Sequence, residues 1–205
     1  MAKVRYDLNV FINCPFDDAY QPIFDALVFS IFDCGFIPRC ALEISDSSQI
    51  RIEKIQNIIA ESKYSVHDIS RTELDTETNL PRFNMPLELG LFLGAKRFGT
   101  GEHNDKACLI MDTERYRYQK FISDISGQDI RVHNGEAESA VGLIRDWLNS
   151  TSNLRTIPGG QRIWSRYKQY RDELPEICAK AHVTEQELTF NDKANFASLW
   201  LKENG

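Results

Sequence analysis

In the first 150 residues, short continuous apolar runs alternate with segments in which apolar residues recur every three to four positions. Residues 8–14 form a short apolar run rich in β-branched side chains and end at a Pro-Phe-Asp-Asp loop, a pattern typical of a buried strand. Ile23, Leu27 and Ile31 then recur at helical spacing, and the segment ends at Gly35, a residue that favours the left-handed conformation of helix ends. The pattern predicts a strand followed by an amphipathic helix.

This switch between spacings repeats along the chain. Short apolar runs predict four more strands, at residues 36–40, 64–69, 107–111 and 130–133. Helical spacing predicts further helices over residues 52–59, 88–95, 116–125 and 141–148. Ser47 or Ser48 is the expected cap of the first of these helices, and Pro38 places its strand at a sheet edge. Alternating strands and helices predict an α/β fold, with a parallel five-stranded sheet and helices on both faces.

From residue 158 onward the pattern predicts helices only. Residues 184–187, Thr-Glu-Gln-Glu, have the spacing of a capping box. We therefore divide the chain into an α/β domain of residues 1–157 and a C-terminal helical extension of residues 158–205. The extension is expected to contain helical segments at residues 162–171, 174–181 and 191–201.

Composition narrows the class of protein. A chain of 205 residues with 42% hydrophobic residues can bury a full core, and it contains no apolar run of the length that a membrane span needs. The five cysteines are scattered, and no pair has zinc-knuckle spacing, so we expect reduced thiols in a cytoplasmic protein without a metal site. The start of the chain does not lead into the apolar stretch of a signal peptide. A net charge of −6 argues against a nucleic-acid partner.

Candidate chemistry is expected beyond the carboxyl ends of the strands, where open parallel sheets bind ligands. No Gly-x-Gly-x-x-Gly and no P-loop motif is present, which excludes those two routes to nucleotide binding. The polar and aromatic side chains that fall at these strand ends are Asn13, Pro15, Phe16, Asp17, Tyr20, Arg39, Asp68, Ser70, Arg71, Asn84 and Glu88.

Three of these segments together resemble a known group of proteins. The strand Val10-Phe11-Ile12-Asn13 before a polar loop, a strand ending in Asp68, and Asn84-x-x-x-Glu88-Leu89-Gly90 at the start of a helix are similar to the nucleoside 2-deoxyribosyltransferase and TIR-domain group. The resemblance covers about residues 7–150 and implies a flavodoxin-like sheet and breakage of a bond between ribose and base. It also implies that Glu88 is the essential carboxylate and that Asp68 helps to handle the base.

Two positions depart from the patterns of that group. Phe83 stands ahead of Glu88 in place of the tryptophan of TIR domains, and Arg82 stands where deoxyribosyltransferases tend to have a second acid. The C-terminal helices belong to neither family. These differences favour simple glycosidic cleavage over transfer of deoxyribose.

The residue types fit this chemistry. Cleavage of an N-glycosidic bond develops oxocarbenium character at the sugar, which a carboxylate such as Glu88 stabilises or captures. A second group orients the ribose or protonates the leaving base, and the candidates are Asp68, Ser70 and Asp17. Arg39 and Arg71 would bind a phosphate. The remaining candidates would contact the substrate, with Phe16 or Tyr20 stacked on the base: Asn13, Pro15, Phe16, Tyr20 and Asn84.

Several interpretations stay open at this stage. The first is an N-glycosidase that acts on NAD or a related nucleotide or nucleoside and needs no cofactor, with NAD a possible substrate. The resemblance alone implies that it is a homo-oligomer and that it acts in prokaryotic defence or nucleotide signalling. The second is a non-catalytic nucleotide-binding sensor, and the third is an interaction scaffold. Structural roles compete with each residue assignment, because Glu88 would also suit the first turn of a helix, and Arg39 and Arg71 would also suit surface ion pairs.

Overall fold

The computed structural model describes residues 5–74, 79–153 and 156–205, and a five-stranded parallel sheet lies at its centre. Its order is β2-β1-β3-β4-β5, and every neighbouring pair is parallel. The strands are β1 (Asn9–Asn13), β2 (Ile37–Arg39), β3 (Tyr64–Asp68), β4 (Ala107–Asp112) and β5 (Arg131–Val132). This is the flavodoxin-like order, and its direction reverses at β1, so the loops after β1 and β3 border the crevice in which such sheets bind ligands.

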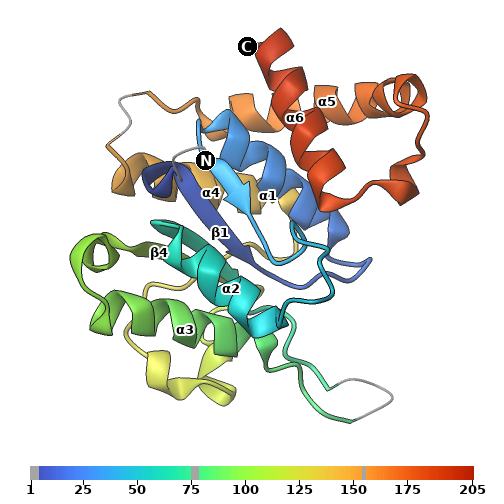
Figure 1. Ribbon diagram of the computed structural model, residues 1–205. Coiled ribbons are helices and arrows are strands. Elements are labelled where there is room, and N and C mark those ends of the chain that lie inside the picture. The colour runs from blue at the N-terminus through green and yellow to red at the C-terminus, as the bar shows by residue number, and fades with distance from the viewer. Residues whose placement is uncertain (1–4, 75–78, 154–155) are drawn as a thin grey trace.

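Helices cover both faces of this sheet (Figure 1). One face carries α1, α4 and the C-terminal helices, and the opposite face carries α2 and α3. The bounds are α1 (Gln21–Asp33), α2 (Arg51–Ala60), α3 (Asn84–Phe98), α4 (Ala137–Thr151), α5 (Gly160–Lys180) and α6 (Phe190–Glu203). Val10 and Ile12 of β1 face the first group of helices and Phe11 faces the second, as the alternation along a strand requires. The predicted α/β class is confirmed.

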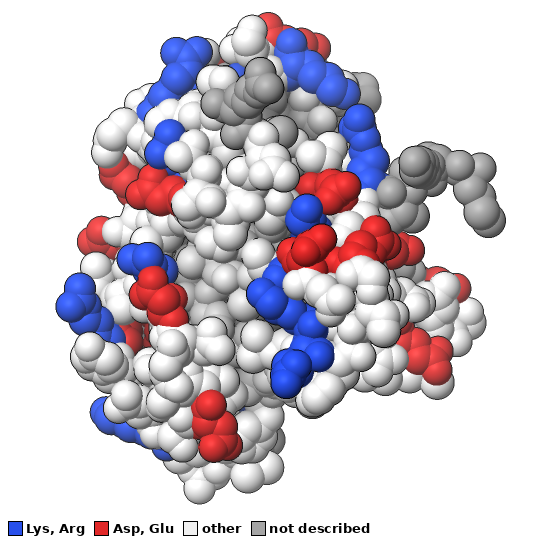
Figure 2. Space-filling model, turned by 90° about the vertical axis from the view of Figure 1, so that its left-hand side faces the viewer, with Lys and Arg blue, Asp and Glu red and all other residues white. Residues whose placement is uncertain are grey.

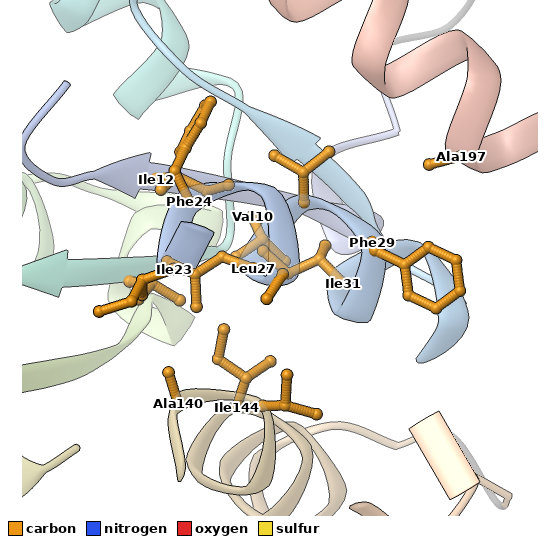
Figure 3. Packing of buried hydrophobic residues seen from close by; sticks show 14 of the residues in the cluster. Val10, Ile12, Ile23, Phe24, Leu27, Phe29, Ile31, Ala140, Ile144 and Ala197 are labelled. Carbon is orange, nitrogen blue, oxygen red and sulfur yellow. The ribbon is translucent and has the colours of Figure 1, made fainter. Parts of the chain in front are cut away.

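Helix α1 links the sheet to the C-terminal helices (Figure 3). Its side chains Ile23 and Leu27 point toward Ala140 and Ile144 of α4, whereas Phe29 points away from them. The Phe29 ring is fully buried and lies 5.2–5.8 Å, between ring centroids, from three aromatic rings of the C-terminal helices: Tyr167, Tyr170 and Trp200. The extension therefore shares one hydrophobic core with α1 and the sheet.

Three predicted local features are wrong. Residues 116–125 form two short 3₁₀ helices, η3 (Arg117–Lys120) and η4 (Ser123–Ile125), because Tyr118 and Ile125 are buried in a cluster beside α3. The hydroxyl of Ser48 donates to Asp46 Oδ1 at 2.7 Å, and α2 begins after Ile50 without a side-chain cap. Helix α3 begins at Asn84 rather than near Glu88.

In the C-terminal extension, one predicted helix boundary is absent from the structure. Residues 162–171 and 174–181 were expected as separate segments, but α5 continues through Pro175. Its buried side chains recur every three to four residues along the whole length and hold the helix against α1: Ile163, Tyr167, Tyr170, Leu174 and Cys178. The predicted capping box is present at Thr184 and Glu187, at the short helix η5 (Glu185–Glu187).

The surface in Figure 2 carries small acidic and basic groups next to one another, with uncharged surface between them. On this face several basic side chains adjoin one another in short rows, and acidic side chains lie beside them. In the described part of the chain, no helix has both the length and the apolar character that a membrane crossing requires.

Candidate functional site

The end of β1 is tied to the start of α3. Asn13 is buried, and its side-chain nitrogen donates to the Met85 carbonyl at 2.8 Å and lies 2.9 Å from Nδ1 of His67. Burial lowers the pKa of His67 to about 3, so the ring is neutral and Nδ1 accepts this hydrogen bond. Asn13 therefore positions the first turn of α3, and its amide donors are used inside the protein.

Glu88 lies in the second turn of α3, one turn beyond the residues that Asn13 holds. Its side chain is buried, with 7% of the residue exposed, and it makes no hydrogen bond or ion pair within the described residues. Burial raises the pKa of Glu88 to about 7, although the positive charge of Arg51 at the start of α2 acts in the opposite direction. Because α3 begins at Asn84, Glu88 is not a first-turn residue and the macrodipole does not explain it.

Asp68 ends β3 and is fully buried in a network of donors. The Tyr20 hydroxyl donates to Oδ2 at 2.6 Å, and the Ser70 backbone N–H donates to Oδ1 at 2.8 Å. Nε2 of His133 lies 2.9 Å from Oδ2 without the geometry of a hydrogen bond, and its Nδ1 accepts from the Gly135 N–H at 3.0 Å. Burial and the Asp68 charge hold the pKa of Tyr20 well above its ordinary value, so its hydroxyl stays a donor. Tyr20 is therefore buried against Asp68, and its ring is not exposed for stacking on a base as the sequence analysis expected.

Asp17 holds two arginines at the loop after β1. Arg71 donates to both oxygens of Asp17, at 3.2 Å from Nε and 2.8 Å from Nη2, and Nη1 of Arg82 lies 3.6 Å away. The hydrogen bond from Arg71 lowers the pKa of Asp17. The two arginine side chains are 41% and 52% exposed, so both are accessible to an anion from solvent.

Cys14 lies in the loop after β1, within range of the charges of three candidate carboxylates. Burial raises the pKa of its thiol well above the ordinary value, and the negative charges of Asp68, Glu88 and Asp17 act in the same direction. The thiol is therefore neutral and a poor nucleophile. The fold brings these three carboxylates together around the loop that follows β1.

The other predicted residues have different environments. Arg39 lies on the edge strand, where it donates twice to Glu43, at 2.7 and 2.6 Å, and once to Glu61 at 3.1 Å, so these ion pairs occupy its guanidinium. Phe16 is exposed and makes an edge-to-face contact with Phe24 at 5.3 Å. Pro15 is buried in the same loop, and Asn84 is exposed at the first position of α3.

Two further polar groups at this edge of the sheet were missed. Asp112 ends β4 and accepts from Nε of Arg117 at 2.8 Å, and Nη2 of Arg117 also donates to the Ile69 carbonyl at 2.9 Å. His133 follows β5 and joins the Asp68 network. The rule that singled out Asp68, a polar residue at a strand end, would also have found Asp112 and His133, whereas no sequence signal marks Arg117.

Three cavities of about 450, 490 and 480 Å³ lie away from Glu88. The first is between α1 and the C-terminal helices, the second is beside β5, and the third lies between α5 and α6. In the described segments, no group of three or more His, Cys, Asp or Glu side chains is arranged to hold a metal ion.

Fold and site together define a doubly wound α/β protein of flavodoxin-like order, with carboxylates gathered at its switch point. Comparison with known proteins gave no match among family models, curated proteins or solved structures.

The raised pKa of Glu88 has a consequence for stability. The folded state holds this proton up to about pH 7, whereas an ordinary glutamate releases it near 4.5, so the free energy of unfolding falls as pH rises between these values. Glu88→Gln removes this titration and is expected to stabilise the fold at pH 8 by up to about 3 kcal/mol, with no gain at pH 4. Urea unfolding at both pH values measures the effect, and an equal difference at the two would show that Glu88 does not titrate in this way.

Proposed function

We propose that this protein is an N-glycosidase that cleaves the bond between ribose and base in NAD or a related nucleotide. The observation that carries the proposal is a buried carboxylate, Glu88, that has no partner within the described residues and stands beside the switch point of the sheet. In such a dry site, a carboxylate stabilises a developing positive charge more strongly than it would in water.

Electron and proton balance favour a substrate whose base is already cationic. In NAD the C1′–N bond breaks with its electron pair going to the pyridinium nitrogen, so nicotinamide leaves as a neutral molecule and needs no proton. Water then adds to C1′ and releases one proton to solvent. Since Asp68 is fully buried and surrounded by donors, it is poorly placed to supply a proton to a leaving base, and NAD does not require one.

Glu88 would stabilise the oxocarbenium ion from one face of the ribose. Near neutral pH its raised pKa leaves a substantial protonated fraction in the free protein. A bound pyridinium cation would favour the charged carboxylate and lower that pKa, so substrate binding itself would ionise the catalytic group. Asp68, Tyr20 and His133 would act as positioning residues beneath the loop after β3.

Arg71 and Arg82 are expected to bind the phosphate of a nucleotide substrate. Arg71 already holds the carboxylate of Asp17 through two N–H donors, the geometry with which guanidinium groups bind phosphates, and Arg82 lies close enough to add a second positive charge. Arg71→Ala should raise KM for a nucleotide about 10-fold or more and leave KM for the matching nucleoside unchanged. Arg97→Ala, at the far end of α3, is the control. If the ratio of KM for the nucleotide to KM for the nucleoside is the same in Arg71→Ala as in the wild type, Arg71 does not bind the phosphate.

The proposal is tested by incubating the protein, over a range of concentrations, with NAD, ATP and a panel of nucleosides, and separating free base by chromatography. Release of nicotinamide supports the proposal, and a steep dependence on protein concentration would indicate that a homo-oligomer is the active form.

The second candidate is a nucleotide sensor, which the exposed arginines beside Asp17 favour. It predicts thermal stabilisation by a nucleotide that is recovered unchanged.

A further inference from the structure

The cavity between α1 and the C-terminal helices is lined by charged side chains that the proposed reaction does not use. Its volume is about 450 Å³, which lies within the range of small-molecule sites. Gln21, Asp25 and Val28 of α1 form one side, and residues of α5, η5 and α6 form the other. Neither Glu88 nor Asp68 lines this cavity, so it is a separate feature of the fold.

Asp25 stands in this cavity with one of its two oxygens occupied. Oδ1 accepts from Lys193 Nζ at 2.8 Å and from Gln21 Nε2 at 2.7 Å. Oδ2 lies 3.9 Å from Nη1 of Arg171, too far for a hydrogen bond, and accepts none from the described residues. The Asp25 and Lys193 side chains are only 17% and 18% exposed, so an open acceptor here is costly unless water or a ligand fills it.

Arg171 presents open donors opposite that acceptor. Its Nη2 donates to Glu185 at 2.9 Å, while Nε and Nη1 make no hydrogen bond within the described part of the chain. The neighbouring Tyr170 lines the same cavity, and burial raises its pKa well above the ordinary value, so its hydroxyl keeps its proton at physiological pH. Ion pairs link Asp25 to Lys193 and Arg171, and Arg171 to Glu185, yet Oδ2 of Asp25 and two nitrogens of Arg171 keep hydrogen-bonding capacity at the wall of the cavity.

The charges in this cavity have both signs. Three carboxylates, Asp18, Asp25 and Glu185, line it together with the cations of Arg171 and Lys193. A simple anion would approach the carboxylates, and a simple cation would approach Arg171 and Lys193, so each would be partly repelled. A small molecule that carries both charges close together would be complementary to the cavity.

Part of the remaining wall is apolar, and two glutamines, Gln21 and Gln186, complete it. Val28, Leu174 and Ala197 are each no more than 2% exposed and line the cavity beside the charged groups. An aliphatic or aromatic side chain against this wall would gain hydrophobic contact without displacing any ion pair.

We propose that this cavity binds a free α-amino acid with an apolar side chain. Its carboxylate would accept from the open donors of Arg171 and from the Tyr170 hydroxyl. Its ammonium group would donate to Oδ2 of Asp25 and to Asp18, and its side chain would lie on the apolar wall. No covalent step is involved, and the site does not depend on the proposed glycosidase activity.

The test measures thermal stabilisation and calorimetric binding with the twenty standard L-amino acids, L-leucinamide and N-acetyl-L-leucine. An apolar amino acid at ten times its Kd should raise Tm by about 3 °C or more. The amide lacks the carboxylate and the acetyl derivative lacks the ammonium group, so each should bind at least about 10-fold more weakly than leucine. Absence of binding by every amino acid, or equal binding of leucine and both derivatives, would overturn the proposal.

Matched variants locate the site. Arg171→Lys keeps the charge but loses the planar fork, and it should weaken amino-acid binding at least about 10-fold. Arg162→Lys, an exposed change on the same helix outside the cavity, should have no effect. Glu88→Gln should leave amino-acid binding intact, which separates this proposal from the glycosidase. Equal binding by the Arg171→Lys and Arg162→Lys variants would place the ligand elsewhere and contradict the assignment.

Discussion

Glu88→Gln is expected to slow release of the base by about 10³-fold or more while the fold is retained. The amide has nearly the shape of the carboxylate but carries no negative charge, so stabilisation of the oxocarbenium ion is lost. Since Glu88 makes no hydrogen bond within the described residues, its replacement breaks none of the hydrogen bonds that hold α3. Single-turnover cleavage of NAD, with nicotinamide measured by chromatography, gives the rate.

The control for this variant is Glu102→Gln, an exposed glutamate at η2 (Gly101–Asp105), which should cleave NAD at the wild-type rate. Circular dichroism checks that both variants are folded. Undiminished cleavage by Glu88→Gln would remove Glu88 from the chemistry. Cleavage lost in both variants would point instead to a general effect of charge.

Phe29→Ala is expected to destabilise the protein by about 3–5 kcal/mol, the usual cost of deleting a buried ring. Phe29 is fully buried, and its ring stacks on Tyr170 at 5.2 Å and contacts Tyr167 and Trp200 at 5.5 and 5.8 Å. The cavity left behind would be bounded by two helices of the extension, and large aromatic neighbours collapse poorly into such a space. Urea unfolding followed by circular dichroism measures the difference.

Phe98→Ala provides the matched control, because Phe98 is 84% exposed at the end of α3. Its loss should change the free energy of unfolding by less than about 0.5 kcal/mol. A similarly small effect for Phe29→Ala would mean that the aromatic cluster does not hold the extension to α1.

The sheet could be predicted because its strands have a strong local signal. The run at β1 is apolar on both faces, which is the pattern of a strand covered on both sides, and all five predicted strands are present. The segment at residues 116–125 was predicted as a helix because its apolar residues have helical spacing. In the structure Tyr118 and Ile125 are buried beside α3, and Arg117 donates to Asp112, five residues earlier, and to the carbonyl of Ile69, which is distant in sequence.

Sequence reasoning selected Glu88, Asp68 and Asp17 as candidates, and Tyr20 and Arg71 as substrate contacts, but it did not predict that these side chains contact one another. Tyr20 and His133 are far apart in sequence, and only the fold places both beside Asp68. Lys106 is a second example of a contact that sequence alone does not predict. It is almost completely buried, and its ammonium group donates to the Ile59 carbonyl at 2.6 Å and to the Ser62 carbonyl. A lysine that caps the end of α2 from within the protein has no signature in sequence.

Because α1 shares one hydrophobic core with α5 and α6, the α/β part of the chain is not expected to be stable without the C-terminal helices. A protein cut after residue 157 would expose Val28 and Phe29, which are now buried under the last two helices. Such a fragment would present an apolar surface to water and would be prone to aggregate. In native-state hydrogen exchange, the amides of α1 and α5 should therefore lose protection in the same cooperative opening, so the extension would behave as part of a single folding unit.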